Sequence, residues 1–289
     1  YMNTEGMQLA NIVLEYVNQP NVEKADGTYY PRVSAVSRCP RDMVMHRYGE
    51  PWSDPPEAQW GTQFRFDMGH DTEERLIVAM AKAAISVQCQ QLTVEKKTQD
   101  GHKVTGHIDG IAVIPHEYPG GGKWYVFDVK SAGQWMYRKV YKSGEAKYEH
   151  IKQIAAYSQM IVNDPKFSHL NGTKLQDLNV EGYEFGGGLV GYVAIDRPTN
   201  GRFGDNKEEL PKVFFASFEI DPEEAEMFLD IFDEVEDHYN NKTMPGFPHP
   251  KSDAVWGGIR CTQRWCSRYS VCQGLTEPKS PELKEVLNG

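Results

Sequence analysis

The chain has 289 residues, and its 31 basic and 41 acidic side chains give a formal charge of −10. Hydrophobic residues make up 39% of it, which is enough for a sizeable core and excludes a disordered chain. No apolar run approaches the roughly 20 residues that span a bilayer, and no secretory signal is recognisable. We therefore expect a cytoplasmic or nucleoid-associated protein with no membrane partner.

The charge is distributed unevenly along the chain. Ten acidic residues and no basic one lie between Glu219 and Asp237, and they account for the whole acidic excess. Lys130 to Lys152, by contrast, holds six basic residues against two acidic ones, a local charge of +4. Because a local patch decides which partner a surface attracts, this segment is a better guide than the net charge.

The sequence predicts strands mixed with helices along the chain. Apolar residues at helical spacing, such as Leu76 and Met80, predict helices, and Asp221 followed by Pro222 is typical of a helix start. The glycine runs at 120–122 and 186–188 are typical of turns. We predict helices over 7–17, within 34–48, over 68–85, over 146–162 and from 221 onward, and strands over 87–94, 104–114, 124–130, 189–195 and 213–220.

This order predicts an α/β fold, with a central mixed sheet flanked by helices. We divide the chain into an N-terminal helical region at 1–60, a core at 61–220 and a C-terminal region at 221–289. The last region holds a helix and a cluster of cysteines.

Chemistry-bearing side chains gather where two predicted strands form a hairpin. Asp128 and Lys130 are two residues apart in one strand, so they project from the same face. The preceding strand carries Asp109, and the hairpin brings Asp109 toward that pair. Two carboxylates and a lysine suit Mg²⁺ or Mn²⁺, with the ammonium orienting or deprotonating a water.

Two predicted helices carry further candidates. His70 and Glu73 are one turn apart at the start of the helix over 68–85, and either could complete a metal site. Gln153 and Tyr157 lie together on the helix over 146–162. Taken singly, these candidates are better explained without a function: Gln153 and Tyr157 as ordinary helix surface, and His70 as a helix-terminal hydrogen bond.

In this order, the elements resemble the PD-(D/E)XK nuclease superfamily, specifically its RecB-like branch. The resemblance implies a restriction-endonuclease-like core. It also implies metal binding by the two strand acids and a helix residue, a lysine that serves the attacking water, and a helix that holds the site and the DNA. Glu73, four residues after Gly69, is the favoured helix ligand, and His70 remains a rival. The matching residues are His70 or Glu73, Asp109, Asp128, Lys130, Gln153 and Tyr157.

The cysteines suggest a second metal site. Cys261, Cys266 and Cys272 lie close together in sequence, and Cys39 is a distant fourth candidate. Cys89, in an apolar strand, is expected to be a buried small hydrophobe. Four thiolates suit zinc or an iron–sulfur cluster, and spacing alone leaves both open.

This one-plus-three arrangement resembles iron–sulfur RecB-like nucleases, including CRISPR-associated RecB-like exonucleases and AddB-type nuclease domains. The resemblance implies that a structural 4Fe-4S cluster joins the N- and C-terminal helical regions, with zinc as the less favoured alternative. The pattern S-x-x-x-x-C-P-R at 34–41 adds to it.

The segment between the lysine and the Gln153 helix alternates aromatic and basic side chains. Such a pattern suits single-stranded nucleic acid, because bases stack on rings while cations meet phosphates. An amphipathic segment with a few core aromatics would have the same composition. The candidates are Trp135, Tyr137, Arg138, Lys139, Tyr141 and Lys142.

We therefore expect a metal-dependent DNA nuclease, an exonuclease acting on single-stranded DNA or on free ends. The exonuclease character comes from the resemblance. Recombination, repair or CRISPR adaptation proteins are the compatible partners, and a viral chain would act in the host cytoplasm. The alternatives are a catalytically inactive DNA- or partner-binding module on the same fold, and a zinc-stapled protein with no nuclease role.

Overall fold

The computed structural model describes residues 31–50, 56–118, 121–163, 182–196, 209–246 and 268–288, without the side chains of 56–67 and 163. The helix predicted over 7–17 lies outside this range. Contacts divide the chain into two compact units. The first comprises Tyr1–Tyr29, Cys39–His70 and His238–Gly289, and the second comprises Tyr30–Arg38 and Asp71–Asp237.

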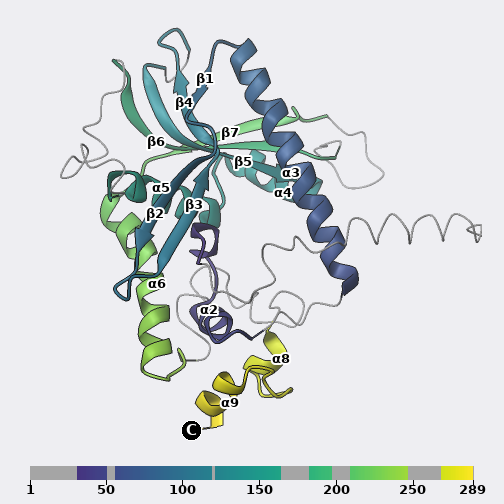
Figure 1. The fold of residues 1–289 in the computed structure, drawn as a ribbon. Helices are drawn as coiled ribbons and strands as arrows, with labels where there is room; N and C mark the ends of the chain where they lie inside the picture. Colours follow the sequence, from purple (N-terminus) through teal and green to yellow (C-terminus); the bar gives the residue numbers. More distant parts are fainter. Residues whose placement is uncertain are drawn as a thin grey trace, which may run out of the picture. The chain divides into compact units, whose positions relative to one another are not determined.

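A five-stranded sheet is the centre of the second unit (Figure 1). The neighbouring β5 and β6 are parallel, whereas the other three pairs are antiparallel, so the sheet is mixed. This confirms an α/β fold with a mixed central sheet. In spatial order, the strands are β1 (Ser86–Gln88), β4 (Gly110–Ile114), β5 (Lys123–Ala132), β6 (Glu184–Ala194) and β7 (Val213–Phe218).

A second, two-stranded sheet splits two of the predicted strands. β2 (Leu92–Lys97) pairs antiparallel with β3 (Lys103–Ile108). The strand predicted over 87–94 is therefore two strands, because Cys89 and Gln91 have positive φ angles and form a turn. The strand predicted over 104–114 breaks at Asp109, where the chain passes from the small sheet to the central one.

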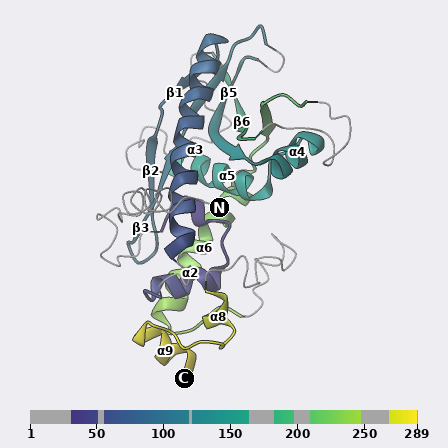
Figure 2. The same cartoon turned by 90° about the vertical axis from the view of Figure 1, so that its right-hand side faces the viewer.

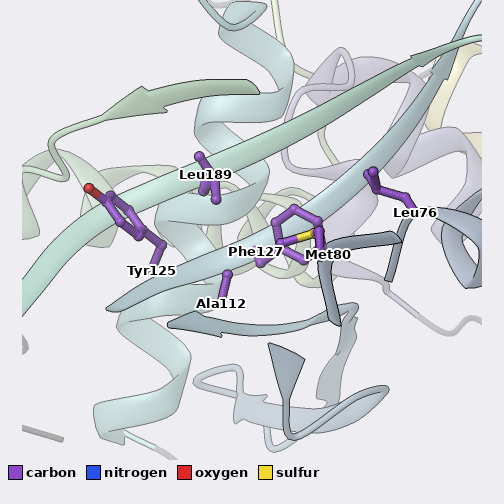
Figure 3. Close-up of a cluster of buried hydrophobic side chains, with 6 residues drawn as sticks. All are labelled: Leu76, Met80, Ala112, Tyr125, Phe127 and Leu189. Carbon is purple, nitrogen blue, oxygen red and sulfur yellow. The ribbon is translucent and has the colours of Figure 1, made fainter. Parts of the chain in front are cut away.

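Helices pack against both faces of the central sheet in the second unit. From α3 (Pro56–Lys82), Leu76 and Met80 pack on one face, in the cluster shown in Figure 3. From α5 (Tyr148–Asn163), Ile154 lies against Gly188 on β6, so α5 covers the other face. The cluster consists of Leu76, Met80, Ala112, Tyr125, Phe127 and Leu189.

The predicted turn at Gly186–Gly188 is wrong, because these glycines lie inside β6. Neighbouring rings explain why glycine is used there. A Cβ at Gly186 would lie 2.5 Å from the Tyr125 ring, and one at Gly188 would lie 2.3 Å from Phe218 Cζ. The run reflects close packing within a strand and not a chain reversal.

Among the remaining helices, α6 was predicted, whereas α4 was not. α4 (Gln134–Ser143) succeeds β5, and η2 (Val33–Ala35) is a short 3₁₀ turn. α6 (Pro222–Asn240) begins as expected, because the Asp221 carboxylate accepts a hydrogen bond from Glu223 N at 2.9 Å. None of the helices among the described residues has the length and apolar character that a membrane crossing requires.

The first unit joins segments from opposite ends of the sequence. α2 (Pro40–Arg47), α8 (Tyr269–Cys272) and α9 (Pro281–Asn288) lie together (Figure 2). The buried Glu50 carboxylate accepts hydrogen bonds from Lys279 N and Ser280 N, at the start of α9. The buried Arg268 donates from Nε to the carbonyl oxygen of Glu50 at 2.9 Å.

Candidate active site on the central sheet

An ion pair on β5 is the core of the candidate site. Asp128 Oδ2 lies 2.6 Å from Lys130 Nζ, whereas Phe127 projects into the apolar cluster on the other face of the sheet. The predicted alternation along this strand is therefore confirmed. The Asp128 side chain is 3% exposed and that of Lys130 is 25% exposed, so only the lysine reaches solvent.

Asp109 joins this pair from the neighbouring chain segment. It lies between β3 and β4, and its Oδ2 atom accepts a hydrogen bond from Val129 N at 2.7 Å. Val129 is the residue between Asp128 and Lys130, so the carboxylate is fixed beside the ion pair. The break that separates β3 from β4 thus places Asp109 at the site.

Burial and neighbouring carboxylates shift the pKa values of Asp109 and Lys130. Burial, and then the Asp128 carboxylate, raise the pKa of Asp109 to about 7. For Lys130, burial alone would lower the pKa, but the Asp128 and Asp109 carboxylates more than offset it and raise the pKa above its usual value. The cluster therefore holds more negative charge than one lysine neutralises, which is a condition that a bound cation relieves.

Of the two helix candidates, Glu73 belongs to the same unit as the acids and His70 does not. The Glu73 carboxylate contributes to the raised pKa values of Asp109 and Lys130, so its charge acts on the site. Its Oε1 atom accepts a hydrogen bond from Gln91. His70 is exposed on α3.

On α5, Gln153 and Tyr157 form a pair, with Gln153 Nε2 donating to Tyr157 Oη at 2.9 Å. Tyr157 is buried, and burial together with the Asp128 charge raises the pKa of its hydroxyl. A Cβ at Gly106 would lie 2.3 Å from the Tyr157 ring, so this glycine lets the ring pack against β3. The structure thus places Gln153 and Tyr157 near the buried Asp128 carboxylate.

Sequence reasoning missed two residues beside the site. His150 lies on α5 one turn before Gln153, and its Nδ1 is 2.7 Å from the Tyr192 hydroxyl. Tyr192 stands opposite Lys130 in the β5–β6 register. The spacing of His150 from Gln153 was a usable signal, whereas the position of Tyr192 depends on a parallel pairing between strands about 60 residues apart.

The donor set fits a hard cation without forming a complete cage. Across the described part of the chain, no group of three or more His, Cys, Asp or Glu side chains is placed to hold a metal ion. However, the buried Oδ2 atom of Asp128 has the Lys130 ammonium beside it at 2.6 Å, and a carboxylate oxygen in an ion pair can also accept a cation. Mg²⁺ is commonly held by one or two carboxylates and keeps several waters, so Asp128 and Asp109 suit it.

The nucleic-acid candidates on α4 divide by exposure. Trp135 is 65% exposed, with Lys139 Nζ 5.9 Å from its ring centroid, and Lys142 is also exposed. Tyr141 and Arg138 are half-buried. The prediction for Tyr137 is wrong, because its side chain is fully buried and its hydroxyl donates to Pro211 O at 2.6 Å. A buried ring cannot stack on a base.

In the first unit, two of the four predicted cluster cysteines are described. Cys39 precedes α2 and Cys272 ends α8. Arg41 Nε donates to Cys272 Sγ at 3.1 Å, and Arg268 pairs with Asp42 at 2.8 Å, so α2 and α8 are held together. Cys261 and Cys266 lie outside the described residues.

Cys89 does not have the buried position expected of it. It is exposed in the turn between β1 and β2, where its positive φ angle of 51° ends the first strand. Cys89 is therefore neither part of a strand nor part of the buried core.

Comparisons with known proteins leave the family open. Neither a family model nor a curated protein matches the chain. One solved structure, described as "Crystal structure of SSO0001", is 14% identical, and the alignment covers 94% of this chain and 98% of that one, with a TM-score of 0.47. No assignment is drawn from a likeness at this level.

The raised pKa of Asp109 predicts a pH-dependent effect of Asp109→Asn on metal-free protein. Well below pH 3.8, Asp109 is protonated in the folded and unfolded states, so its ionisation contributes nothing to the stability difference. As the pH rises toward about 7, the unfolded state loses this proton first, and the folded wild type is destabilised. We expect the variant to gain stability over the wild type across this range, and to keep the gain at higher pH.

Urea unfolding with EDTA at several pH values measures this difference. Asp71→Asn, at an exposed position of α3, controls for the substitution itself. A stability difference for Asp109→Asn that is constant between pH 4 and pH 8 would contradict the assignment of a raised pKa to this carboxyl group.

Proposed function

We propose that the protein is a metal-dependent DNA nuclease of the PD-(D/E)XK type. The observation that carries this proposal is the Asp128–Lys130 ion pair at 2.6 Å, with Asp109 hydrogen-bonded to the residue between them. Two carboxylates and an ammonium group, brought together from two chain segments and largely buried, are expensive to maintain unless they are used.

These groups match the requirements of phosphodiester hydrolysis. A bound Mg²⁺ or Mn²⁺ would neutralise charge on the phosphate and lower the pKa of a water. Asp109 and Asp128 would hold the cation. Glu73, on α3, adds negative charge near them. Lys130, an ammonium group paired with Asp128, orients the attacking water and stabilises the negative charge that develops on it. Gln153 and Tyr157 fix the position of α5 against the acids.

The substrate is DNA that is single-stranded or has free ends. Support comes from the exposed Trp135 with Lys139 near its ring, and from the exposed Lys142 on the same helix. An exposed indole beside cations offers a base a stacking surface and its phosphate a counter-charge. Exonuclease action, and partners from recombination, repair or CRISPR adaptation, follow from the family resemblance.

A structural 4Fe-4S cluster in the first unit is part of the proposal. Cys39 and Cys272 would supply two ligands, and Cys261 and Cys266 the others. Support comes from the contacts that hold α2 to α8 and from the Arg41 donor at Cys272 Sγ, which favours a sulfur that carries negative charge. Four thiolates leave no open position, so the cluster has no part in the cleavage.

One observation favours a second candidate, which is a catalytically inactive DNA- or partner-binding module on the same fold. The described residues include no group of three metal-binding side chains. The assay described next separates the two candidates, because an inactive module binds DNA but leaves it intact with Mn²⁺.

Lys130→Ala is expected to lower the rate of DNA cleavage by at least about 100-fold, because the attacking water loses its amine partner. The assay is digestion of end-labelled single-stranded DNA in Mn²⁺, with EDTA abolishing cleavage by the wild type. Lys103→Ala is the matched control, since Lys103 lies on β3 of the same unit with its side chain 58% exposed. Wild-type rates in Lys130→Ala would contradict the assignment of Lys130.

Trp135→Ala is expected to weaken binding of single-stranded DNA about 5- to 150-fold, which corresponds to the ~1–3 kcal/mol of one stacking contact. Fluorescence anisotropy of labelled DNA, recorded with EDTA to prevent cleavage, measures the affinity. Met227→Ala removes a side chain of equal exposure, 66%, from α6 and is expected to bind normally. Equal DNA affinities of the two variants would contradict the assignment of α4 to the DNA-binding surface.

Cys39→Ser is expected to lose the iron and the brown colour of protein purified without air. Iron and zinc analysis, together with visible absorbance, provide the measurement. Cys89→Ser replaces an exposed cysteine in a turn and is expected to keep full iron content. A colourless wild type that contains zinc would show that the alternative metal occupies the site.

A further inference from the structure

His150 is held in a defined orientation by Tyr192. The Tyr192 ring is fully buried, and its hydroxyl accepts a hydrogen bond from Lys147 N at 3.0 Å. The same hydroxyl lies 2.7 Å from His150 Nδ1, and the two rings are 5.6 Å apart between centroids. A buried hydroxyl of this kind fixes the ring that it contacts.

These contacts also favour one tautomer of the imidazole. The hydroxyl has one hydrogen of its own, and since it accepts from Lys147 N, that hydrogen is available to His150 Nδ1. Burial, and then the charges of Lys130 and Lys147, lower the pKa of His150 to about 2. The ring is therefore neutral, and we assign its proton to Nε2, because this tautomer gives the buried Tyr192 hydroxyl hydrogen an acceptor at Nδ1.

The imidazole stands beside the candidate site. His150 is one turn before Gln153 on α5, and the Lys130 charge acts on it. Tyr192, which holds it, is the register partner of Lys130. An ammonium group and an Nε2–H are both donors, so they do not bond to each other. Lys130 already has Asp128 as its acceptor, whereas the Nε2–H requires another one, and the ligand of a phosphodiesterase site supplies phosphate oxygens.

We infer that His150 is a substrate-contacting catalytic residue that donates a hydrogen bond from Nε2 to a non-bridging oxygen of the reacting phosphate, beside Lys130. The inference rests on the proposed function. A neutral donor suits this place because it stabilises the phosphate without competing with Lys130 for the Asp128 carboxylate. Tyr192 is a positioning residue, since it acts through His150.

The test compares His150→Ala with wild type in single-turnover cleavage of single-stranded DNA at saturating enzyme in Mn²⁺. Loss of one hydrogen bond to a charged group predicts cleavage about 10- to 150-fold slower, with DNA affinity in EDTA nearly unchanged. Free imidazole added to His150→Ala is expected to restore part of the rate, because it supplies the missing N–H donor. Tyr192→Phe is expected to slow cleavage to a smaller extent.

Two controls separate the possible outcomes. Lys130→Ala should gain nothing from imidazole, and the melting temperature of His150→Ala should remain close to that of the wild type. A slow His150→Ala variant that imidazole does not rescue and that melts at lower temperature would assign His150 a structural role and overturn the inference. Wild-type rates in His150→Ala would overturn this inference alone, whereas a wild type that cleaves nothing would overturn the proposed function with it.

Discussion

The ion pair between Asp128 and Lys130 is the interaction on which the rest of the site depends. A buried carboxylate is costly unless it is paired, and here the pairing uses the two-residue alternation of a single strand. Because Phe127 and its apolar neighbours occupy the opposite face, the strand can present charge on one side only. Three other candidate groups are positioned relative to this pair: Asp109 through Val129 N, Tyr157 through its burial near Asp128, and His150 through Tyr192.

The two sheets explain how a second carboxylate reaches the pair. Ile108 still pairs with β2, and Gly110 already pairs with β5, so Asp109 lies at the change of partner. A residue at such a point is free of both ladders, and its side chain can accept a backbone hydrogen bond from β5. Gly106 contributes in the same region, because the absence of a Cβ lets Tyr157 approach β3. The break at Asp109 and the missing Cβ at Gly106 thus bring together side chains from the β3–β4 connection, β5 and α5.

Much of this arrangement could be predicted from the sequence, and the remainder could not for identifiable reasons. Alternation alone placed Asp128 and Lys130 on one face, and the hairpin between β4 and β5 was evident from two apolar strands around a turn. The break at Asp109 was not evident, because apolar residues continue on both sides of it. Gly186–Gly188 was misinterpreted as a turn, since a glycine run in sequence does not reveal the rings that pack over it. Tyr137 carried the same local pattern as Trp135, and only the tertiary packing separates a buried ring from an exposed one.

The central claim is that Asp109 and Asp128 bind a divalent cation, and titration calorimetry with Mn²⁺ on the intact chain tests it most directly. The account predicts saturable binding by the wild type. It also predicts that Asp128→Asn and Asp109→Asn each weaken this binding by at least about tenfold, the loss typical of an impaired metal site. Glu74→Gln, at an exposed position of α3, should bind as the wild type does. Equal Mn²⁺ affinity in all four proteins would contradict the account.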